Sequence, residues 1–330
     1  MKSLVTGGGG FLGSAIVRQL LDHGDEVTVY ARGDYSLLYA LGARTIRGEL
    51  TDNKHLQSAL AGMDAVFHVA AKAGIWGPWE DYYRANVLGT QTVITACRSQ
   101  GVAKLVYTSS PSVVFDNRAH SGCDESLPYP ARYENYYSHT KAIAEQAVIA
   151  ANGDDLLTVA LRPHLIFGPD DPHLLPRVIA RARAGKLVRI GDGRNRVDLT
   201  YVEDAARAHL LACAALQPGS AVAGSVYFIT QDEPVALWPW IDELLSRLAI
   251  TPVKRRIPLG IARVLGHTLE LIYRGFNLSG EPRLSRFLAS ELALDHFYDI
   301  SRAKRDLGYR PQLDMEVALQ NTLETLKAAY

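Results

Sequence analysis

Tyr137 and Lys141 stand four residues apart, at a point where a helix is expected to begin. This spacing places both side chains on one face of that helix. The unperturbed pKa of tyrosine, about 10, is too high for efficient proton transfer at neutral pH, and a nearby cation lowers it by favouring the phenolate. Such pairs often decorate helix surfaces, but Thr108, Ser109 and Ser110 add hydroxyl groups at the end of an expected strand. Together these residues indicate proton transfer to or from a substrate oxygen.

A run of glycines lies between the first expected strand and the first expected helix. The segment from Thr6 to Gly13 fits a GxGxxG spacing at Gly8, Gly10 and Gly13, and equally a TGxxGxxG spacing that begins at Thr6 and Gly7. Glycines allow a tight turn and let the backbone approach a pyrophosphate that rests on the helix N-terminus. The segment therefore predicts a dinucleotide site.

The end of the second expected strand bears on the choice of dinucleotide. An acidic residue there binds the ribose 2′-hydroxyl of NAD, whereas an arginine accommodates the 2′-phosphate of NADP. This chain has Ala31 where the acid is expected and Arg32 directly after it. The planar, permanently charged guanidinium suits a phosphate. We expect NADP(H), with NAD as the alternative because Asp34 could still reach a ribose hydroxyl.

The elements that must position these residues alternate between strand and helix. Strands are expected over residues 3–5, 26–30, 44–47, 65–69, 105–108 and 156–161, and helices over 11–23, 82–100 and 136–151. Most of the strands are apolar throughout, as in a parallel sheet that is buried on both faces. The alternation predicts a doubly wound α/β fold with a parallel Rossmann sheet.

The sequence changes character after Arg162. Prolines at positions 163, 169, 172 and 176 interrupt the strand–helix alternation. We expect a dinucleotide-binding domain over residues 1–162 and, over 163–330, mainly a smaller substrate-binding lobe with segments that return to the first domain. Residues 257–276 predict an amphipathic helix over an apolar pocket, and peripheral contact with a membrane surface is the alternative for this helix.

Composition excludes several classes of protein. The chain has 330 residues, 48% of them hydrophobic, and 35 basic against 35 acidic residues, which disfavours a nucleic-acid partner. The cysteines Cys97, Cys123 and Cys213 lack metal-ligand spacing, so no metal is expected and a reducing compartment is favoured. The chain has no uncharged apolar run of about 18 residues, and its first residues lead straight into the glycine segment, so we expect no signal peptide. We expect a cytoplasmic protein without a transmembrane segment.

In this combination of motifs the chain resembles the short-chain dehydrogenase/reductase superfamily in its extended form. The shared motifs are the glycine segment, Tyr137 with Lys141, and residues 68–71, 86–90, 107–110, 161–163, 298–301 and 306–309. The resemblance implies that Ser110 holds the substrate carbonyl, that Tyr137 transfers the proton, and that Lys141 binds the nicotinamide ribose while lowering the pKa of Tyr137. Ser112 is the alternative hydroxyl.

The resemblance also implies two sets of binding residues. Those expected at the cofactor follow the strand ends and helix starts: Gly7, Gly10, Phe11, Leu12, Gly13, Arg32, Glu49, Leu50, Val69, Ala70, Ala71, Lys72, Asn86, Thr108, Tyr137, Lys141 and Pro163. Among them, Glu49 stands where relatives commonly carry an aspartate near the adenine, and Asn86 is more often structural or a relay. Those expected at the substrate are Trp76, Trp79, Ser112 and His164.

Departures from the superfamily pattern reduce the number of reactions that the chain is expected to catalyse. Sugar-nucleotide dehydratases carry an Asp-Glu pair where this chain has Pro111 and Ser112, so dehydration is disfavoured. Sugar-nucleotide epimerases usually carry an arginine at the position of Val197, which Arg194 or Arg196 could replace only if the loop shifts.

Four segments resemble the 3β-hydroxysteroid dehydrogenase branch of the superfamily, and within it the bacterial 2-alkyl-3-oxoalkanoate reductases of long-chain olefin synthesis. They are residues 74–82, 109–115, 136–141 and 283–288. This implies an NADP(H)-dependent oxidoreductase that interconverts 3-oxo and 3-hydroxy groups on a hydrophobic substrate. The favoured reaction is reduction of a 2-alkyl-3-oxoalkanoic acid to the 3-hydroxy acid. The alternatives are a sterol or 3β-hydroxysteroid dehydrogenase, a sugar-nucleotide epimerase and a non-enzymatic dinucleotide sensor. Relatives pair through helices that correspond to residues 80–100 and 136–151, so a homodimer is expected.

Overall fold

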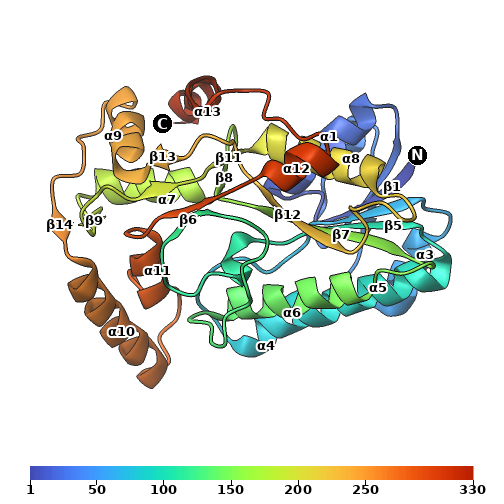
Figure 1. Cartoon of the computed structure of the whole chain (residues 1–330), viewed down its shortest axis with the longest axis horizontal. Coiled ribbons are helices and arrows are strands. Elements are labelled where there is room, and N and C mark those ends of the chain that lie inside the picture. Colours follow the sequence, from blue (N-terminus) through green and yellow to red (C-terminus); the bar gives the residue numbers. More distant parts are fainter. Residues whose placement is uncertain (330) are drawn as a thin grey trace.

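A parallel sheet of seven strands forms the centre of the chain (Figure 1). The computed structural model describes residues 1–329. The strands run in the order β12-β7-β5-β4-β1-β2-β3. Their bounds are β1 Lys2–Thr6, β2 Glu26–Ala31, β3 Arg44–Arg47, β4 Ala65–His68, β5 Lys104–Thr108, β7 Leu157–Pro163 and β12 Ser225–Ile229. The strands expected from sequence are confirmed, and β12 is an addition from the second half of the chain.

The sheet is buried on both faces, which explains why its strands do not alternate between apolar and polar residues. Leu4 and Val66 belong to the core on one face, whereas their neighbours Val5 and Phe67 belong to the core on the other. Helices α1 (Phe11–Asp22) and α8 (Val202–Ala215) cover one face, and α3 (Asn53–Leu60), α5 (Gly89–Gln100) and α6 (Tyr136–Ala150) cover the other (Figure 1). The doubly wound fold is therefore confirmed.

The order in which successive strands are added to the sheet reverses at β1. The chain proceeds from β1 to β2 and β3 on one side, and from β4 outward on the other. In sheets of this kind a ligand binds at the carboxyl ends of the strands on either side of the reversal. The glycine segment follows β1 directly, so the fold places it at this point.

The helix expected over residues 82–100 is longer and contains an irregular segment. It comprises α4 (Trp79–Tyr82), a π-helical segment η1 (Tyr83–Leu88) and α5. π-helical turns inside helices often mark functional sites, and this one carries Asn86.

Helix α6 begins where expected because Asn135 caps it. The Asn135 side chain accepts a hydrogen bond of 2.8 Å from the Ser138 amide. This bond satisfies one of the free amides of the first turn, so Tyr137 lies at the very start of the helix.

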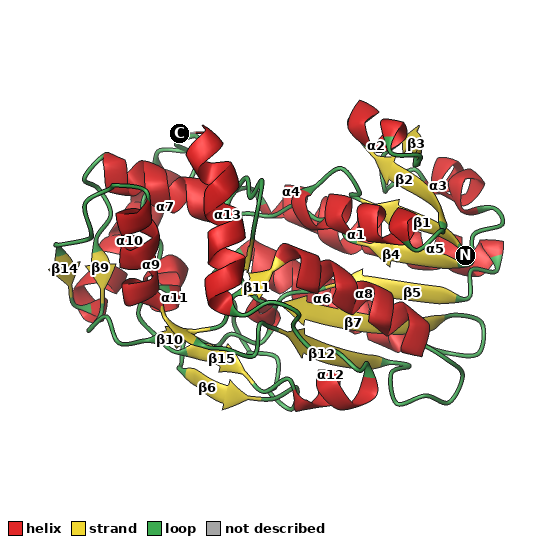
Figure 2. Ribbon diagram, turned by 90° about the horizontal axis from the view of Figure 1, so that it is seen from above, coloured by secondary structure: helices red, strands yellow, loops and turns green. Residues whose placement is uncertain are grey.

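The second half of the chain adds short strands and helices beside the sheet (Figure 2). A four-stranded sheet contains β13 (Val235–Ala236), β10 (Arg196–Val197), β15 (His296–Tyr298) and, from the first half of the chain, β6 (His120–Cys123). Two further pairs join β11 (Thr200–Tyr201) with β8 (Ile166–Phe167), and β14 (Arg256–Ile257) with β9 (Arg189–Ile190). The helices are α2 (Ser36–Ala40), which comes from the first half, and α7 (Leu174–Arg183), α9 (Leu237–Arg247), α10 (Leu259–Gly275), α11 (Arg286–Glu291), α12 (Ser301–Asp306) and α13 (Met315–Ala329).

The helix expected over residues 257–276 is confirmed as α10. Across residues 1–329, no helix has the length and hydropathy needed to cross a membrane.

Candidate active site

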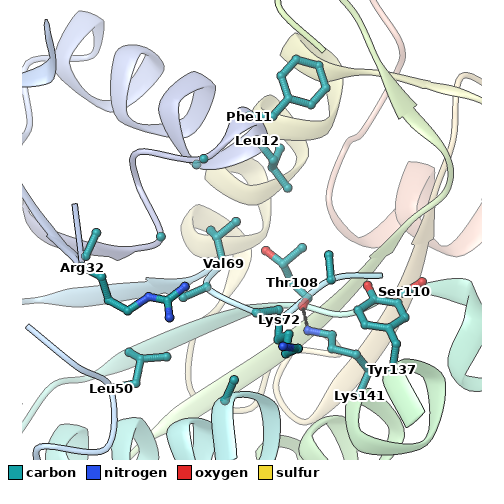
Figure 3. A pocket seen from close by; sticks show the side chains of 18 of the residues that line it. Phe11, Leu12, Arg32, Leu50, Val69, Lys72, Thr108, Ser110, Tyr137 and Lys141 are labelled. Atoms are coloured by element: carbon teal, nitrogen blue, oxygen red, sulfur yellow. Dashed lines mark hydrogen bonds between the residues drawn. The ribbon is translucent and has the colours of Figure 1, made fainter. Parts of the chain in front are cut away.

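A cleft of about 830 Å³ lies at the carboxyl ends of the central strands. It contains nearly all the residues expected at the cofactor and all three residues expected at the reaction centre, Ser110, Tyr137 and Lys141 (Figure 3). The expected residues that line it are Gly7, Gly10, Phe11, Leu12, Gly13, Arg32, Glu49, Leu50, Val69, Ala70, Ala71, Lys72, Thr108, Ser110, Tyr137, Lys141 and Pro163.

Two glycines of the first loop are required by its geometry. Gly7 has φ +68°, and a Cβ there would lie 2.8 Å from the backbone of Ala70. A Cβ on Gly13 would lie 2.2 Å from the carbonyl oxygen of Gly7. Gly10, the residue before α1, offers no side-chain cap to the free amides of the first helical turn. These amides and the helix dipole suit a pyrophosphate group at this end of the cleft.

Arg32 lies at the same end, directly after β2, with its guanidinium in the cleft (Figure 3). The side chain is exposed and has no hydrogen bond or ion pair with any other part of residues 1–329. Asp34, the alternative ribose ligand, does not line the cleft.

Tyr35 lines the cleft beside Arg32, and sequence reasoning missed it. A Cβ on Gly9 would lie 2.0 Å from the Tyr35 ring, and one on Gly33 would lie 2.9 Å from it. Both glycines therefore make room for this ring. The motif TGxxGxxG requires neither Gly9 nor Gly33. These two extra glycines were the signal in the sequence that another side chain occupies the space beside them.

Tyr137 and Ser110 meet at the other end of the cleft (Figure 3). Burial raises the pKa of Tyr137 above its usual value of 10.0, and a hydrogen bond with the Ser110 side chain acts in the opposite direction. The net direction differs from the lowering expected from the Tyr137–Lys141 pair, because burial outweighs the interactions that favour the phenolate. Tyr137 is therefore a protonated hydroxyl at neutral pH.

Lys141 is buried, with 2% of its surface exposed. Its Nζ donates a hydrogen bond of 2.6 Å to the Thr108 carbonyl oxygen and lies 4.1 Å from the centroid of the Tyr107 ring. Burial lowers the pKa of Lys141 from 10.5 to about 7, while the negative charge of Glu145 acts to raise it. The amino group of Lys141 can therefore gain or lose a proton near neutral pH.

Ser112 does not line the cleft, but it contacts Ser110, which does. The two hydroxyl oxygens are 3.0 Å apart, and the Ser112 amide donates to the Ser110 Oγ at 3.2 Å. Ser112 thus orients the Ser110 hydroxyl.

Asn86 is buried behind the cleft rather than in its wall. Its amide nitrogen donates to the Thr140 Oγ1 at 3.0 Å and to the Lys72 carbonyl oxygen at 3.2 Å, and its Oδ1 accepts from the Lys72 amide at 2.8 Å. Asn86 therefore ties the cleft-lining loop after β4 to α6, beside Lys141.

Three residues expected at the substrate lie outside the cleft wall. The Trp79 ring packs 5.4 Å from Tyr136 on α6. Trp76 lies 6.1 Å from Tyr273 of α10, edge to face. His164 is buried, and its Nε2 lies 2.6 Å from the Nδ1 of His296.

The second half of the chain closes the cleft with residues that the sequence did not single out. Leu165, Ile166, Asp171 and His173 all line it. The Asp171 carboxylate accepts hydrogen bonds from the backbone amides of His173, Leu174 and Leu175, which begin α7. Asp171 therefore shapes this wall by holding the start of a helix.

The parallel sheet has a glycine loop at the point where its strand order reverses, and this loop lines one end of the cleft. A serine, a tyrosine and a lysine lie at the other end of the cleft. Together these features define an oxidoreductase that uses a nicotinamide dinucleotide. Residues 4–259 match the model of the 3-beta hydroxysteroid dehydrogenase/isomerase family, and the chain belongs to this family. The resemblance that the sequence motifs suggested is confirmed.

Two curated relatives are similar along nearly the whole chain. A 2-alkyl-3-oxoalkanoate reductase of Stenotrophomonas maltophilia is 47% identical over 324 residues, which is 97% of this chain and 98% of the relative. A decarboxylating sterol-4-alpha-carboxylate 3-dehydrogenase of Mus musculus is 37% identical over 98% of this chain and 90% of the relative.

Among solved structures, MoeE5 in complex with UDP-glucose and NAD superimposes with a TM-score of 0.77 and 26% identity, covering 100% of this chain and 99% of that one. That protein binds NAD, which agrees with a nicotinamide dinucleotide in the cleft described above.

Proposed function

We propose that the protein reduces 2-alkyl-3-oxoalkanoic acids to the corresponding 3-hydroxy acids with NADPH. The observation that carries this proposal is the meeting of Ser110 and Tyr137 beside Lys141 in a cleft whose other end holds Arg32. The similarity to the reductase of Stenotrophomonas maltophilia over 97% of the chain supports the choice of substrate class.

The chemistry of the site fits reduction of a ketone. Bound NADPH would supply a hydride to C3 of the substrate. The Ser110 hydroxyl would donate a hydrogen bond to the 3-oxo oxygen, and Tyr137 would transfer its proton to that oxygen as the C–H bond forms. The proton returns to Tyr137 from solvent, so one oxo acid, one NADPH and one proton yield one hydroxy acid and NADP⁺.

The protonation states support this direction. The raised pKa of Tyr137 keeps its hydroxyl protonated at neutral pH, as a proton donor requires. Lys141, with a pKa of about 7, can take up and release a proton beside it. Its ammonium would also hold the nicotinamide ribose.

Arg32 supports NADP(H) over NAD(H). A guanidinium that has no other partner within residues 1–329, beside Ala31 instead of an acid, favours a 2′-phosphate over a hydroxyl pair.

Other reactions of this fold find less support. Pro111 follows Ser110, so the acid pair of the dehydratases is missing. Val197 is 0% exposed and packs against Leu237 and Trp238, away from the cleft. Arg196 lies over the Phe297 ring at 5.0 Å, and it does not line the cleft either.

A sterol dehydrogenase is the second candidate, because the mouse enzyme is 37% identical over nearly the whole chain.

The proposal includes the setting in which the enzyme works. Residues 1–162 would hold the cofactor, and residues 163–330 would mainly hold the substrate. The three cysteines are free thiols, which fits the reducing conditions of the cytoplasm. A homodimer would form through α5 and α6.

The test is turnover of the purified protein with NADPH or NADH against 2-alkyl-3-oxo acids, 3-oxosteroids and UDP-sugars. Consumption of NADPH only with the oxo acids, together with formation of the hydroxy acid, is the expected result. Steroid turnover at a higher kcat/KM would establish the second candidate. Conversion of a UDP-sugar without net consumption of cofactor would overturn both.

A further inference from the structure

Four charged side chains meet between α7 and the segment that precedes α11. The Arg177 guanidinium binds the Glu281 carboxylate at 2.5 Å, and the Arg181 guanidinium donates to the Arg283 carbonyl oxygen at 3.1 Å. Neither Arg181 nor Arg283 has an ion pair within residues 1–329. We call Arg177, Arg181, Glu281 and Arg283 the rim cluster. It contains three positive charges and one negative charge.

Two contacts place the rim cluster beside the cleft. His173 lines the cleft and stands directly before α7, so Arg177 follows it one helical turn later on the same side. Ala73, in the loop after β4, lines the cleft too, and a Cβ on the next residue, Gly74, would lie 3.1 Å from Glu281 Oε1. The ion pair of Arg177 and Glu281 therefore joins α7 to this loop at the edge of the cleft.

Tyr82 indicates which end of the cleft the rim cluster borders. Its hydroxyl donates a hydrogen bond of 2.9 Å to the Gly74 carbonyl oxygen. Burial raises the pKa of Tyr82 to about 12, and electrostatic interactions with Glu281 and with Tyr137 add to the increase. Both of these groups therefore lie near the Tyr82 hydroxyl. The rim cluster thus borders the end of the cleft that holds Tyr137.

The charges of the rim cluster are not balanced. Burial lowers the pKa of Arg181, and the guanidiniums of Arg177 and Arg283 lower it further, while Glu281 acts to raise it. A half-buried cation without a carboxylate partner is unfavourable in the folded chain. A second carboxylate would reduce the repulsion among the three guanidiniums. The planar fork of an arginine also matches a carboxylate with two parallel hydrogen bonds.

We propose that the rim cluster is the subsite for the carboxylate of the oxo acid substrate, with Arg177 as the residue that binds it. This inference rests on the proposed function and names the residues that would distinguish an acid from a neutral ketone. In a 2-alkyl-3-oxo acid the carboxylate carbon is two bonds from C3, so the carboxylate lies at the same end of the cleft as Tyr137. When it binds, Arg177 turns toward the substrate, and Arg181 and Arg283 remain to balance the charge of Glu281.

The test compares a short 2-alkyl-3-hydroxy acid with its methyl ester, using whichever of NADP⁺ and NAD⁺ supports oxidation. This direction is chosen because the hydroxy acid, unlike the oxo acid, does not readily lose carbon dioxide. The ratio of kcat/KM for the acid to kcat/KM for the ester measures the contribution of the carboxylate charge. We expect the wild type to prefer the acid by about tenfold or more. The preference should shrink as salt is raised, because the side chain of Arg177 is 63% exposed.

Two variants should move this ratio in opposite directions. Arg177→Gln should lower it about tenfold, because the substrate carboxylate loses its partner. Glu281→Gln should raise it, because the acid that competes for Arg177 is removed. An ion pair that only holds the rim together would give the same direction of change in both variants.

The remaining variants are controls. Arg177→Lys keeps the positive charge but not the planar fork, so it should retain part of the preference for the acid. Lys186→Gln removes an exposed positive charge just beyond the end of α7, at a residue that does not line the cleft, and should leave the ratio at its wild-type value. Melting temperatures of all the variants check that the fold is retained.

Three results would overturn the subsite while leaving an oxidoreductase function intact. In the first, the wild type has equal kcat/KM for the acid and the ester. In the second, Arg177→Gln leaves the ratio unchanged. In the third, Arg177→Gln and Glu281→Gln change it in the same direction. Absence of turnover with both compounds would instead overturn the proposed function, and the subsite with it.

Discussion

Glu145 and Arg162 form a buried ion pair with two hydrogen bonds behind the candidate active site. The Arg162 Nε donates to Glu145 Oε2 at 2.9 Å and its second nitrogen donates to Oε1 at 2.6 Å, with both side chains at most 2% exposed. The Tyr129 hydroxyl donates to the same carboxylate at 2.6 Å. Glu145 stands one helical turn after Lys141, and its charge opposes the lowering of the lysine pKa by burial. The pair therefore joins α6 to β7 and also acts on the protonation of Lys141.

The substitution Glu145→Gln tests this double role. Without the carboxylate charge, the pKa of Lys141 should fall further below about 7. If catalysis needs the protonated lysine, the alkaline limb of kcat/KM should move to lower pH by about one unit. The loss of one partner should also lower the free energy of unfolding by about 3 kcal/mol, because Arg162 remains buried without its counter-charge. The measurements are a pH–rate profile and urea unfolding.

Gln146→Ala, at an exposed site on the same helix, is the control and should change neither quantity. A lower stability with an unmoved alkaline limb would show that the pair is structural only.

Lys141 itself should reduce the stability of the folded chain. Its pKa is 10.5 when unfolded and about 7 when folded. Between these values the unfolded chain holds a proton that the folded chain has lost, so stability rises as pH increases through this window. Below pH 7 the folded chain bears the full cost of a buried ammonium.

The variant Lys141→Met should therefore be more stable than the wild type below pH 7, by about 1–3 kcal/mol after the lost hydrogen bond to Thr108 is subtracted. The difference should shrink as pH rises toward 10.5. Turnover should be lost and cofactor binding weakened. Lys104, which donates to the Cys213 carbonyl oxygen at 3.0 Å and does not line the cleft, provides the comparison: Lys104→Met should not be stabilised. The check is chemical denaturation of all three proteins across this pH range.

The sequence predicted the sheet well because its signals are local. Most of the six expected strands are short apolar runs next to a helix with its own spacing, and the structure has all six. The strand β12 was missed because nothing near residues 225–229 continues the alternation, and its partner β7 lies more than sixty residues earlier. Non-local pairing of this kind leaves no trace in a short window.

The same limit applies to the site. The glycine loop, Arg32, Ser110 and Tyr137 line one cleft because each follows a strand end or begins a helix, and the fold brings those points together. The surroundings of Trp76 and Trp79 depend instead on which distant helix covers them, here α10 and α6. The direction of the Tyr137 pKa shift could not be predicted either, since it depends on burial that many elements create jointly.

Tyr137→Phe should abolish turnover while leaving NADPH binding nearly intact. The ring and its packing remain, but the oxygen that transfers the proton is gone. General acid catalysis contributes about 10² to 10⁴ in rate, so the loss should fall in that range. The measurements are kcat by loss of NADPH absorbance and cofactor affinity by fluorescence.

Tyr136→Phe is the control, since Tyr136 is 41% exposed, packs on Trp79 and does not line the cleft. Activity above about a tenth of the wild type in Tyr137→Phe would remove the residue from the mechanism.

A homodimer through α5 and α6 should depend on the outer faces of these helices. Leu88, the last residue of η1 before α5, is 40% exposed and Tyr136 is 41% exposed, and Ile143 and Ala147 are half-buried along the same side of α6. An interface of this kind normally buries about 1,200–2,000 Å² and does not tolerate unpaired charge at its centre. Ile143→Glu should therefore convert the dimer to a monomer in light scattering, whereas Val317→Glu on α13 should not. A wild type that is already monomeric at micromolar concentration would contradict the prediction.

Arg32 should set the preference for NADPH. A charge-assisted contact with the 2′-phosphate favours NADPH over NADH by about 1.5–3 kcal/mol, or about ten- to a hundredfold in kcat/KM. We expect the lower end, because Arg32 is exposed and salt screens the pair. Arg32→Ala should raise KM for NADPH and change the kinetics with NADH little. Adding Ala31→Asp should turn the preference toward NADH, since the carboxylate accepts hydrogen bonds from the ribose hydroxyls and repels the phosphate.

The control is Arg44→Ala, which removes another exposed arginine at the far end of β3 and should leave the preference unchanged. Equal kcat/KM for both cofactors in the wild type would show that Arg32 only faces solvent.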